Sequence, residues 1–164
     1  MEKVDIVNEK GEYLRTQDRA EIVDLNEHIQ TVHIYLVTRE KEIYIQQRAT
    51  NKEENPNLWE SVGGGVMTGE DIFTAAVREI KEETGIDYPK NSLIFLGKVI
   101  CKKYLVNSFV AIIDSRDLFI PQIEEIKNTM FVSFEEIINL INHDRFYSTS
   151  FGLFQKFYLE NFNE

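Results

Sequence analysis

The alternation of apolar and polar residues along the chain predicts a fold that mixes strands with helices. Short alternating segments rich in β-branched and aromatic residues are typical of half-buried strands. Such strands are predicted at residues 3–7, 30–38, 42–47, 93–104, 108–113 and 130–134. The second and third of these are expected to pair around the polar triplet 39–41, and Gly11 marks a turn within an otherwise polar stretch.

Three longer segments carry apolar residues at helical spacing instead. Residues 72–84 contain neither glycine nor proline, and residues 134–141 and 149–162 show the same kind of periodicity. The last of these is expected to be a core helix, with a dimer surface as the alternative. A mixed sheet packed between helices follows, which places the chain in the α/β class.

The segment 72–84 also carries signals for its two ends and its buried face. Thr68 or Gly69 is the expected N-terminal cap, and Gly85 is placed to end the helix in a left-handed conformation. The apolar stripe expected to pack on the sheet consists of Phe73, Val77 and Ile80.

Composition and charge narrow the functional classes. The 164 residues suit a single domain, 1–164, in which 1–29 form an N-terminal lead-in. The lack of a long apolar run or a signal-peptide core argues against a membrane span, and the single Cys101 rules out an internal disulfide, so a cytoplasmic location is expected. A net charge of −10 without a basic stripe argues against long nucleic acid, but a small phosphorylated ligand remains compatible.

Three carboxylates are expected to share one face of the helix at 72–84. Glu79, Glu82 and Glu83 stand at positions i, i+3 and i+4, and a single arginine, Arg78, can pair with Glu82 but cannot neutralise all three. Clustered hard oxygen ligands suit Mg²⁺ or Mn²⁺, which also accept oxygens from phosphates. The alternative interpretation is the solvated face of an amphipathic helix.

The surrounding residues decide between these interpretations. Residues 64–86 match the pattern G-x5-E-x7-R-E-U-x-E-E-x-G-U, where U is a bulky aliphatic residue. The matching positions are Gly64, Glu70, Arg78, Glu79, Ile80, Glu82, Glu83, Gly85 and Ile86. This segment closely resembles the signature of the Nudix (MutT-like) hydrolase family. The signature covers about a seventh of the chain.

The resemblance implies an α/β/α sandwich and a metal-dependent hydrolase. Such enzymes cleave the diphosphate linkage of a nucleoside diphosphate derivative, or of a related small phosphorylated metabolite, with an activated water. Glu79, Glu82, Glu83 and a backbone carbonyl near Gly63 would bind the metal, with catalytic roles for Glu82, Glu83 and Arg78. The structural positions of the motif would be Gly64, Glu70 and Gly85. The general base is either a motif glutamate or a later acid, the candidates being Glu124, Glu125, Glu135 and Glu136.

Residues outside the motif resemble a Nudix subgroup similar to isopentenyl diphosphate isomerase. In that subgroup, positions matching Arg48 and Lys52 contact the diphosphate. Gly64 and Gly65 would let the backbone approach the substrate closely, although the glycine run also fits a tight strand-to-helix turn.

Two alternative functions remain. An isomerase would need a cysteine, a histidine and an acid where this chain has Gly63, Gly65 and, by a looser alignment, Ser108. A non-catalytic nucleotide-binding domain would not need all the motif acids, which are present here. The substrate stays open, as do the number of metal ions and a homodimer; Tyr104 stands at a spacing reminiscent of diadenosine polyphosphate hydrolases.

Overall fold

The computed structural model describes residues 2–114 and 126–162, which form one mixed sheet with helices on both faces. The strands are β1 (Lys3–Val7), β2 (Tyr13–Asp18), β3 (His28–Thr38), β4 (Ile43–Arg48), β5 (Trp59–Glu60), β6 (Val62–Gly65), β7 (Ile94–Cys101), β8 (Tyr104–Ile113) and β9 (Ile126–Val132). The helices are α1 (Ile72–Thr84), the short 3-10 helix η1 (Lys90–Ser92), α2 (Phe134–Asn142) and α3 (Phe151–Asn161). The predicted α/β class, with a mixed sheet between helices, is confirmed.

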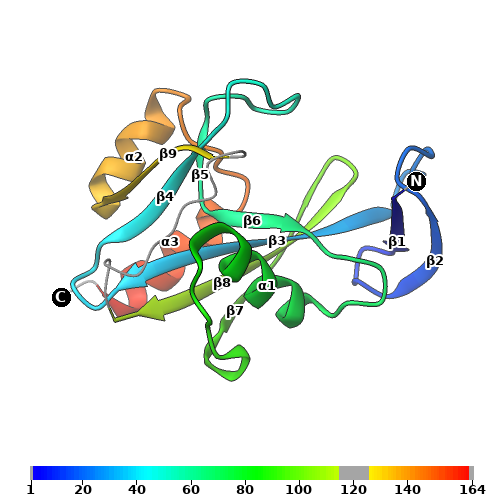
Figure 1. The fold of residues 1–164 in the computed structure, drawn as a ribbon, viewed down its shortest axis with the longest axis horizontal. Coiled ribbons are helices and arrows are strands. Elements are labelled where there is room, and N and C mark those ends of the chain that lie inside the picture. The colour runs from blue at the N-terminus through cyan, green and yellow to red at the C-terminus, as the bar shows by residue number, and fades with distance from the viewer. Residues whose placement is uncertain (1, 115–125, 163–164) are drawn as a thin grey trace.

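Strand β3 is the centre of the molecule. It pairs in parallel with β8 along its length and antiparallel with β1, β4 and β6. Alternate side chains of a strand face opposite sides of the sheet. Ile34 and Leu36 therefore pack with α1, whereas Tyr35 and Val37 pack with α2 and α3. Figure 1 shows α1 and α3 on opposite sides of β3.

The bounds of α1 agree with the prediction, but its N-terminal cap does not. Asp71, rather than Thr68 or Gly69, accepts a hydrogen bond from the Thr74 amide at 2.9 Å. Its carboxylate reaches the third amide of the helix, where a capping oxygen is required. Gly85 ends the helix with a left-handed φ of 79°, as expected.

The N-terminal lead-in is a β-hairpin that the sequence prediction described only in part. The strand at Lys3–Val7 is confirmed, but the stretch after Gly11 is not an irregular polar segment, because Tyr13–Asp18 pairs with β1. Polar side chains fit this strand because much of it is solvent-exposed. The hairpin extends from the far end of β3, as Figure 1 shows.

Several further boundaries differ from the prediction, and two of the differences have clear local reasons. Tyr104 begins β8 rather than ending β7, because the chain turns at residues 102–103. The last strand ends at Val132, since Ser133 caps α2 with a reciprocal capping box.

In the described part of the chain, no helix is long and apolar enough to cross a membrane.

Candidate functional site

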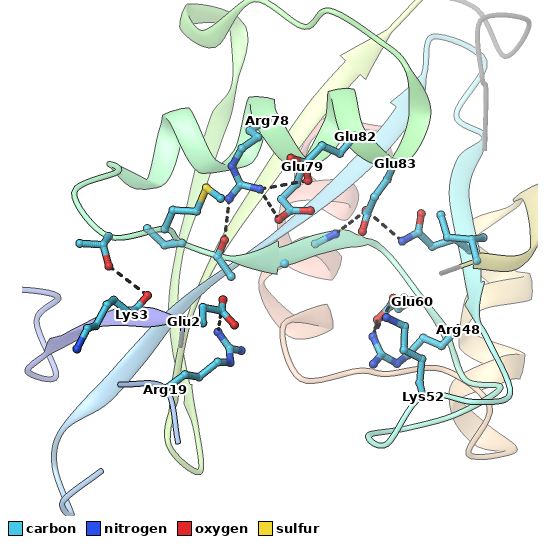
Figure 2. A pocket seen from close by; sticks show the side chains of 18 residues that line it. Glu2, Lys3, Arg19, Arg48, Lys52, Glu60, Arg78, Glu79, Glu82 and Glu83 are labelled. Atoms are coloured by element: carbon cyan, nitrogen blue, oxygen red, sulfur yellow. Dashed lines mark hydrogen bonds and ion pairs between the residues drawn. The ribbon is translucent and has the colours of Figure 1, made fainter. Parts of the chain in front are cut away.

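A cavity of about 890 Å³ opens between α1, the glycine-rich strand β6, the β4–β5 region and the N-terminal hairpin. Its charged lining residues are Glu2, Glu60, Glu79, Glu82, Glu83, Lys3, Arg19, Arg48, Lys52 and Arg78. In Figure 2, the acids of α1 lie above β6, whereas Arg19 and Arg48 lie below it and apart from each other. The cavity therefore combines an acidic side with two separate cationic ends, in a chain that is strongly acidic overall.

Arg78 forms hydrogen bonds with several residues of the motif at once. Its guanidinium donates to Glu70 at 2.8 and 3.0 Å, to Glu79 at 2.8 Å and to the Gly65 carbonyl at 2.8 Å. The predicted contact with Glu82 is present but longer, at 3.2 Å. Arginine suits this position because its planar fork can serve several acceptors at once. Its donors are used within the protein, which indicates that Arg78 positions the acids.

The glycine run is a strand rather than a turn, and close packing explains two of its members. A side chain on Gly64 would overlap the carboxylate of Glu79. A Cβ on Gly63 would lie 2.6 Å from the Val32 carbonyl oxygen, closer than real Cβ atoms approach. Glycine at position 64 lets α1 bring Glu79 directly against β6, and glycine at position 63 lets β6 lie close against β3.

Glu83 is the most deeply buried of the motif acids. Its Oε2 accepts hydrogen bonds from the Gly63 amide and from the Gln46 side chain, both at 3.1 Å. Burial raises its pKa well above the ordinary value, and the charges of Glu79 and Glu60 raise it further. Such a carboxylate is poised either to accept a proton or to take up a cation.

The two residues predicted to bind phosphate lie at one end of the cavity, together with an acid that sequence reasoning missed. Arg48 contacts Glu60 at 3.3 Å and donates to the Glu54 carbonyl at 2.9 Å. Burial raises the pKa of Glu60, although Arg48 opposes that shift. Lys52 also lines the cavity. Glu60 lies just before the motif, outside its pattern, so the spacing of the motif residues does not mark it.

The predicted site residues do not all hold equivalent positions. Glu79 and Glu83 are buried beside the glycine strand, whereas the Glu82 side chain is 49% exposed. Of the later acids, Glu136 closes the capping box of α2, Glu135 is exposed, and neither lines this cavity. The candidates Glu124 and Glu125 lie outside the described residues.

A second, smaller cavity of about 190 Å³ adjoins the first across the glycine strand. It contains Tyr104 and Tyr147, and the Tyr147 ring meets His33 edge-on at 5.6 Å. His33 contacts the Ser150 hydroxyl at 2.9 Å, and burial lowers its pKa to about 4. His33 is therefore a hydrogen-bonded residue of β3 at the wall of this cavity.

The residues present fit a hard divalent cation in chemistry, but the ligands are not preassembled. Among the described residues, no three His, Cys, Asp or Glu side chains converge on one point that could hold a metal ion. Glu79 and Glu83 nevertheless bring oxygens into one buried region, and the Gln46 Oε1 there has no hydrogen-bond partner in the described structure. Recruiting Glu82, whose side chain is half exposed, would complete a set of oxygen ligands typical of Mg²⁺ or Mn²⁺.

Comparison with known proteins identifies the family. The model of the NUDIX domain matches residues 27–154 of this chain. The chain belongs to the Nudix family. A Nudix hydrolase of Listeria innocua is 38% identical over 88 residues, which is 52% of each chain, so the match spans about half the length of this relative. The isomerase-like subgroup is not confirmed by these relatives.

Solved structures show the same Nudix fold. A protein of Deinococcus radiodurans superposes with a TM-score of 0.72 and 22% identity, over 88% of this chain and 91% of that one. A bifunctional NMN adenylyltransferase/ADP-ribose pyrophosphatase from Francisella tularensis, complexed with AMP and manganese, gives a TM-score of 0.62. It is 20% identical, over 81% of this chain and 41% of that one.

Proposed function

We propose that this Nudix protein is a metal-dependent pyrophosphohydrolase. It cleaves a diphosphate linkage in a nucleoside diphosphate derivative or a related small phosphorylated metabolite. The observation that carries the proposal is the burial of Glu79 and Glu83 against a glycine strand, beside a large cavity with cationic ends. The Francisella neighbour, with its manganese and AMP, supports a divalent metal and a nucleotide-like ligand.

Each group of residues has a defined task in this proposal. Glu79, Glu82, Glu83 and a carbonyl near Gly63 hold Mg²⁺ or Mn²⁺, which offsets the phosphate charges and promotes attack by water. Arg48 and Lys52 bind the phosphates from one end of the cavity, and Gly64 and Gly65 line it along β6 as the predicted backbone contacts of the substrate. Arg78 positions Glu79 and Glu82, and together with Glu70 and Gly85 it fixes the shape of the motif.

Glu83 is the better placed of the two catalytic acids to accept the proton of the attacking water. Effective proton transfer requires a pKa near the working pH, and burial together with Glu79 and Glu60 moves the pKa of Glu83 in that direction. Glu82 is half exposed and is better suited to completing the metal site.

A screen for phosphate release tests this function. The panel contains nucleoside triphosphates, dinucleoside polyphosphates, nucleotide sugars, ADP-ribose and isoprenoid diphosphates, each with Mg²⁺ and with Mn²⁺. Glu83→Gln should lower turnover by about three orders of magnitude or more while the fold stays intact, as loss of a catalytic acid does. A folded variant with wild-type turnover would contradict the proposal.

The alternatives give different results in the same screen. A non-catalytic binding domain would bind a nucleotide without releasing phosphate. An isomerase would convert isopentenyl diphosphate without releasing phosphate, but Gly63 and Gly65 lack the side chains that such chemistry needs. The cytoplasmic location, the single domain and a homodimer stay predictions.

A further inference from the structure

Arg19, at the end of the N-terminal hairpin, lines the same cavity as the motif acids. A Cβ built on Gly65 would lie 3.6 Å from the Arg19 Nη1, so the guanidinium lies against the last residue of the glycine strand. Arg19 also lines the smaller neighbouring cavity. The family model matches residues 27–154, so Arg19 lies outside the matched residues.

The hairpin holds Arg19 in a fixed place relative to the motif. The Arg19 amide donates to the Glu2 carbonyl at 2.9 Å, which secures the end of β2 against β1. The hairpin is in turn bonded to the loop before α1, since Thr68 donates to the Lys3 carbonyl at 3.2 Å and the Gly69 amide to Asp5 at 2.9 Å. These contacts attach the cationic end of the cavity to the element that carries the motif acids.

The guanidinium of Arg19 is the most available of the three arginines that line the cavity. Arg78 is surrounded by acceptors, and Arg48 contacts Glu60 and the Glu54 carbonyl. The ion pair between Arg19 and Glu2 is long, at 3.5 Å, and the two side chains are 39% and 69% exposed. Exposed pairs of this kind are weak, so an incoming anion can displace Glu2.

The cationic side chains that line the cavity fall into two separate groups. Arg48 and Lys52 lie together, and Arg19 lies apart from them, as Figure 2 shows. A compact diphosphate bound at the end that holds Arg48 and Lys52 would leave Arg19 paired with Glu2.

We propose that Arg19 binds a phosphate beyond the cleaved diphosphate, so that the preferred substrate carries a chain of three or more phosphates. This inference rests on the proposed function and narrows its substrate class. Glu2 occupies the guanidinium in the free protein and is displaced when the chain of phosphates spans β6. Substrates with a neutral group at this end gain nothing from Arg19.

Calorimetric titration of the full chain with inorganic triphosphate and inorganic diphosphate, in the presence of Mg²⁺, tests this selectivity. Arg19→Ala should weaken triphosphate binding by about tenfold or more, the scale of a charge-assisted hydrogen bond, and change diphosphate binding by less than about twofold. Arg19→Lys should restore part of the loss, and Glu2→Gln should tighten triphosphate binding.

Arg39→Ala is the matched control, because it removes one positive charge at an exposed pair with Asp114 outside this cavity. It should change neither affinity. The proposal would be overturned if Arg19→Ala weakened the binding of both ligands equally, or of neither. It would also be overturned if the wild type did not bind triphosphate more tightly than diphosphate. Circular dichroism and Tm confirm that each variant is folded.

Phosphate release measured in parallel separates this inference from the proposed function. If Glu83→Gln abolishes release but Arg19→Ala leaves the triphosphate preference intact, only the assignment of Arg19 fails. If no compound of the panel is hydrolysed but Arg19→Ala still selectively weakens triphosphate binding, the role of Arg19 in anion recognition stands. The proposed hydrolase function is then wrong.

Discussion

The two faces of strand β3 are covered by different kinds of side chain and have different roles. On the α1 side, carboxylates are buried against glycines, and Arg78 and Gln46 place their oxygens individually. On the α3 side, aromatic rings fill the space, as in the stack of Tyr35 on Phe154 at 4.2 Å. Buried charge requires a specific partner for each atom, whereas an aromatic core requires mainly volume and shape. The first face is therefore expected to determine activity and the second to determine stability.

Phe154→Ala should produce the largest effect on stability. Phe154 is fully buried and contacts Tyr35, Phe151 and Tyr158. Removing such a ring leaves a cavity and costs about 3–5 kcal/mol. Urea unfolding measures the loss, and the remaining folded protein should keep its kcat. Leu159→Ala, on the same helix but 45% exposed, should cost less than about 1 kcal/mol.

A lower kcat in folded Phe154→Ala protein, with little change in unfolding free energy, would contradict the division between the two faces. It would mean that the α3 side also shapes the active cavity.

Arg78→Ala should affect activity more than stability. The substitution releases Glu70, Glu79 and Glu82 from one guanidinium, and losing a residue that orients metal ligands typically costs about 10–100-fold in metal affinity or activity. Arg78→Lys should recover only part, because an ammonium cannot serve all these acceptors at once. Metal titration and steady-state kinetics measure both effects.

Lys81→Ala is the control for Arg78→Ala, since Lys81 lies on the same helix but pairs with the exposed Asp87. It should leave kinetics and metal affinity unchanged. Wild-type metal affinity and rate in Arg78→Ala would remove the positioning role.

The α1 side of β3, which carries the motif, is also the side that is easier to predict from the sequence. The spacing of Gly64, Arg78 and Gly85 specified the helix bounds, its left-handed end and the pairing of Arg78 with Glu82. These relations are local, lying within one helix and its flanks, so the sequence order itself encodes them.

The rest of the candidate site depends on contacts between distant segments. Glu60 and Gln46 reach Glu83 only because β4 and β5 pair beside β6, and Arg19 reaches Gly65 only because an unpredicted strand extends the sheet. The alternative that the glycine run forms a tight turn is wrong, because the run pairs with β3, and such pairing cannot be seen in a sequence without side-chain periodicity. Arg48 and Lys52 could be named only through the family resemblance.

The smallest expected effect is a gain of stability in Glu83→Gln when a chelator removes divalent metal. The pKa of Glu83 is raised in the folded protein, so its contribution to stability is fully present below its ordinary value of 4.5 and is lost as pH rises through the folded pKa. A neutral glutamine keeps an oxygen for the Gly63 amide and does not lose this contribution. The Tm of Glu83→Gln should therefore equal that of wild type near pH 4.5 and exceed it at alkaline pH. The expected difference is about 2–4 °C for each kcal/mol of electrostatic repulsion that the substitution removes.

Metal addition sharpens this test. Mg²⁺ should stabilise wild type more than Glu83→Gln, because the charged carboxylate then gains a cation in place of its repulsion with Glu79 and Glu60. Glu82→Gln is the matched control for exchanging a carboxylate for an amide on the same helix, because the Glu82 side chain is half exposed. A Tm difference for Glu83→Gln that is the same at acidic and alkaline pH would show that packing, rather than buried charge, separates the two proteins. The contrast between the two faces of β3 would then rest on shape alone.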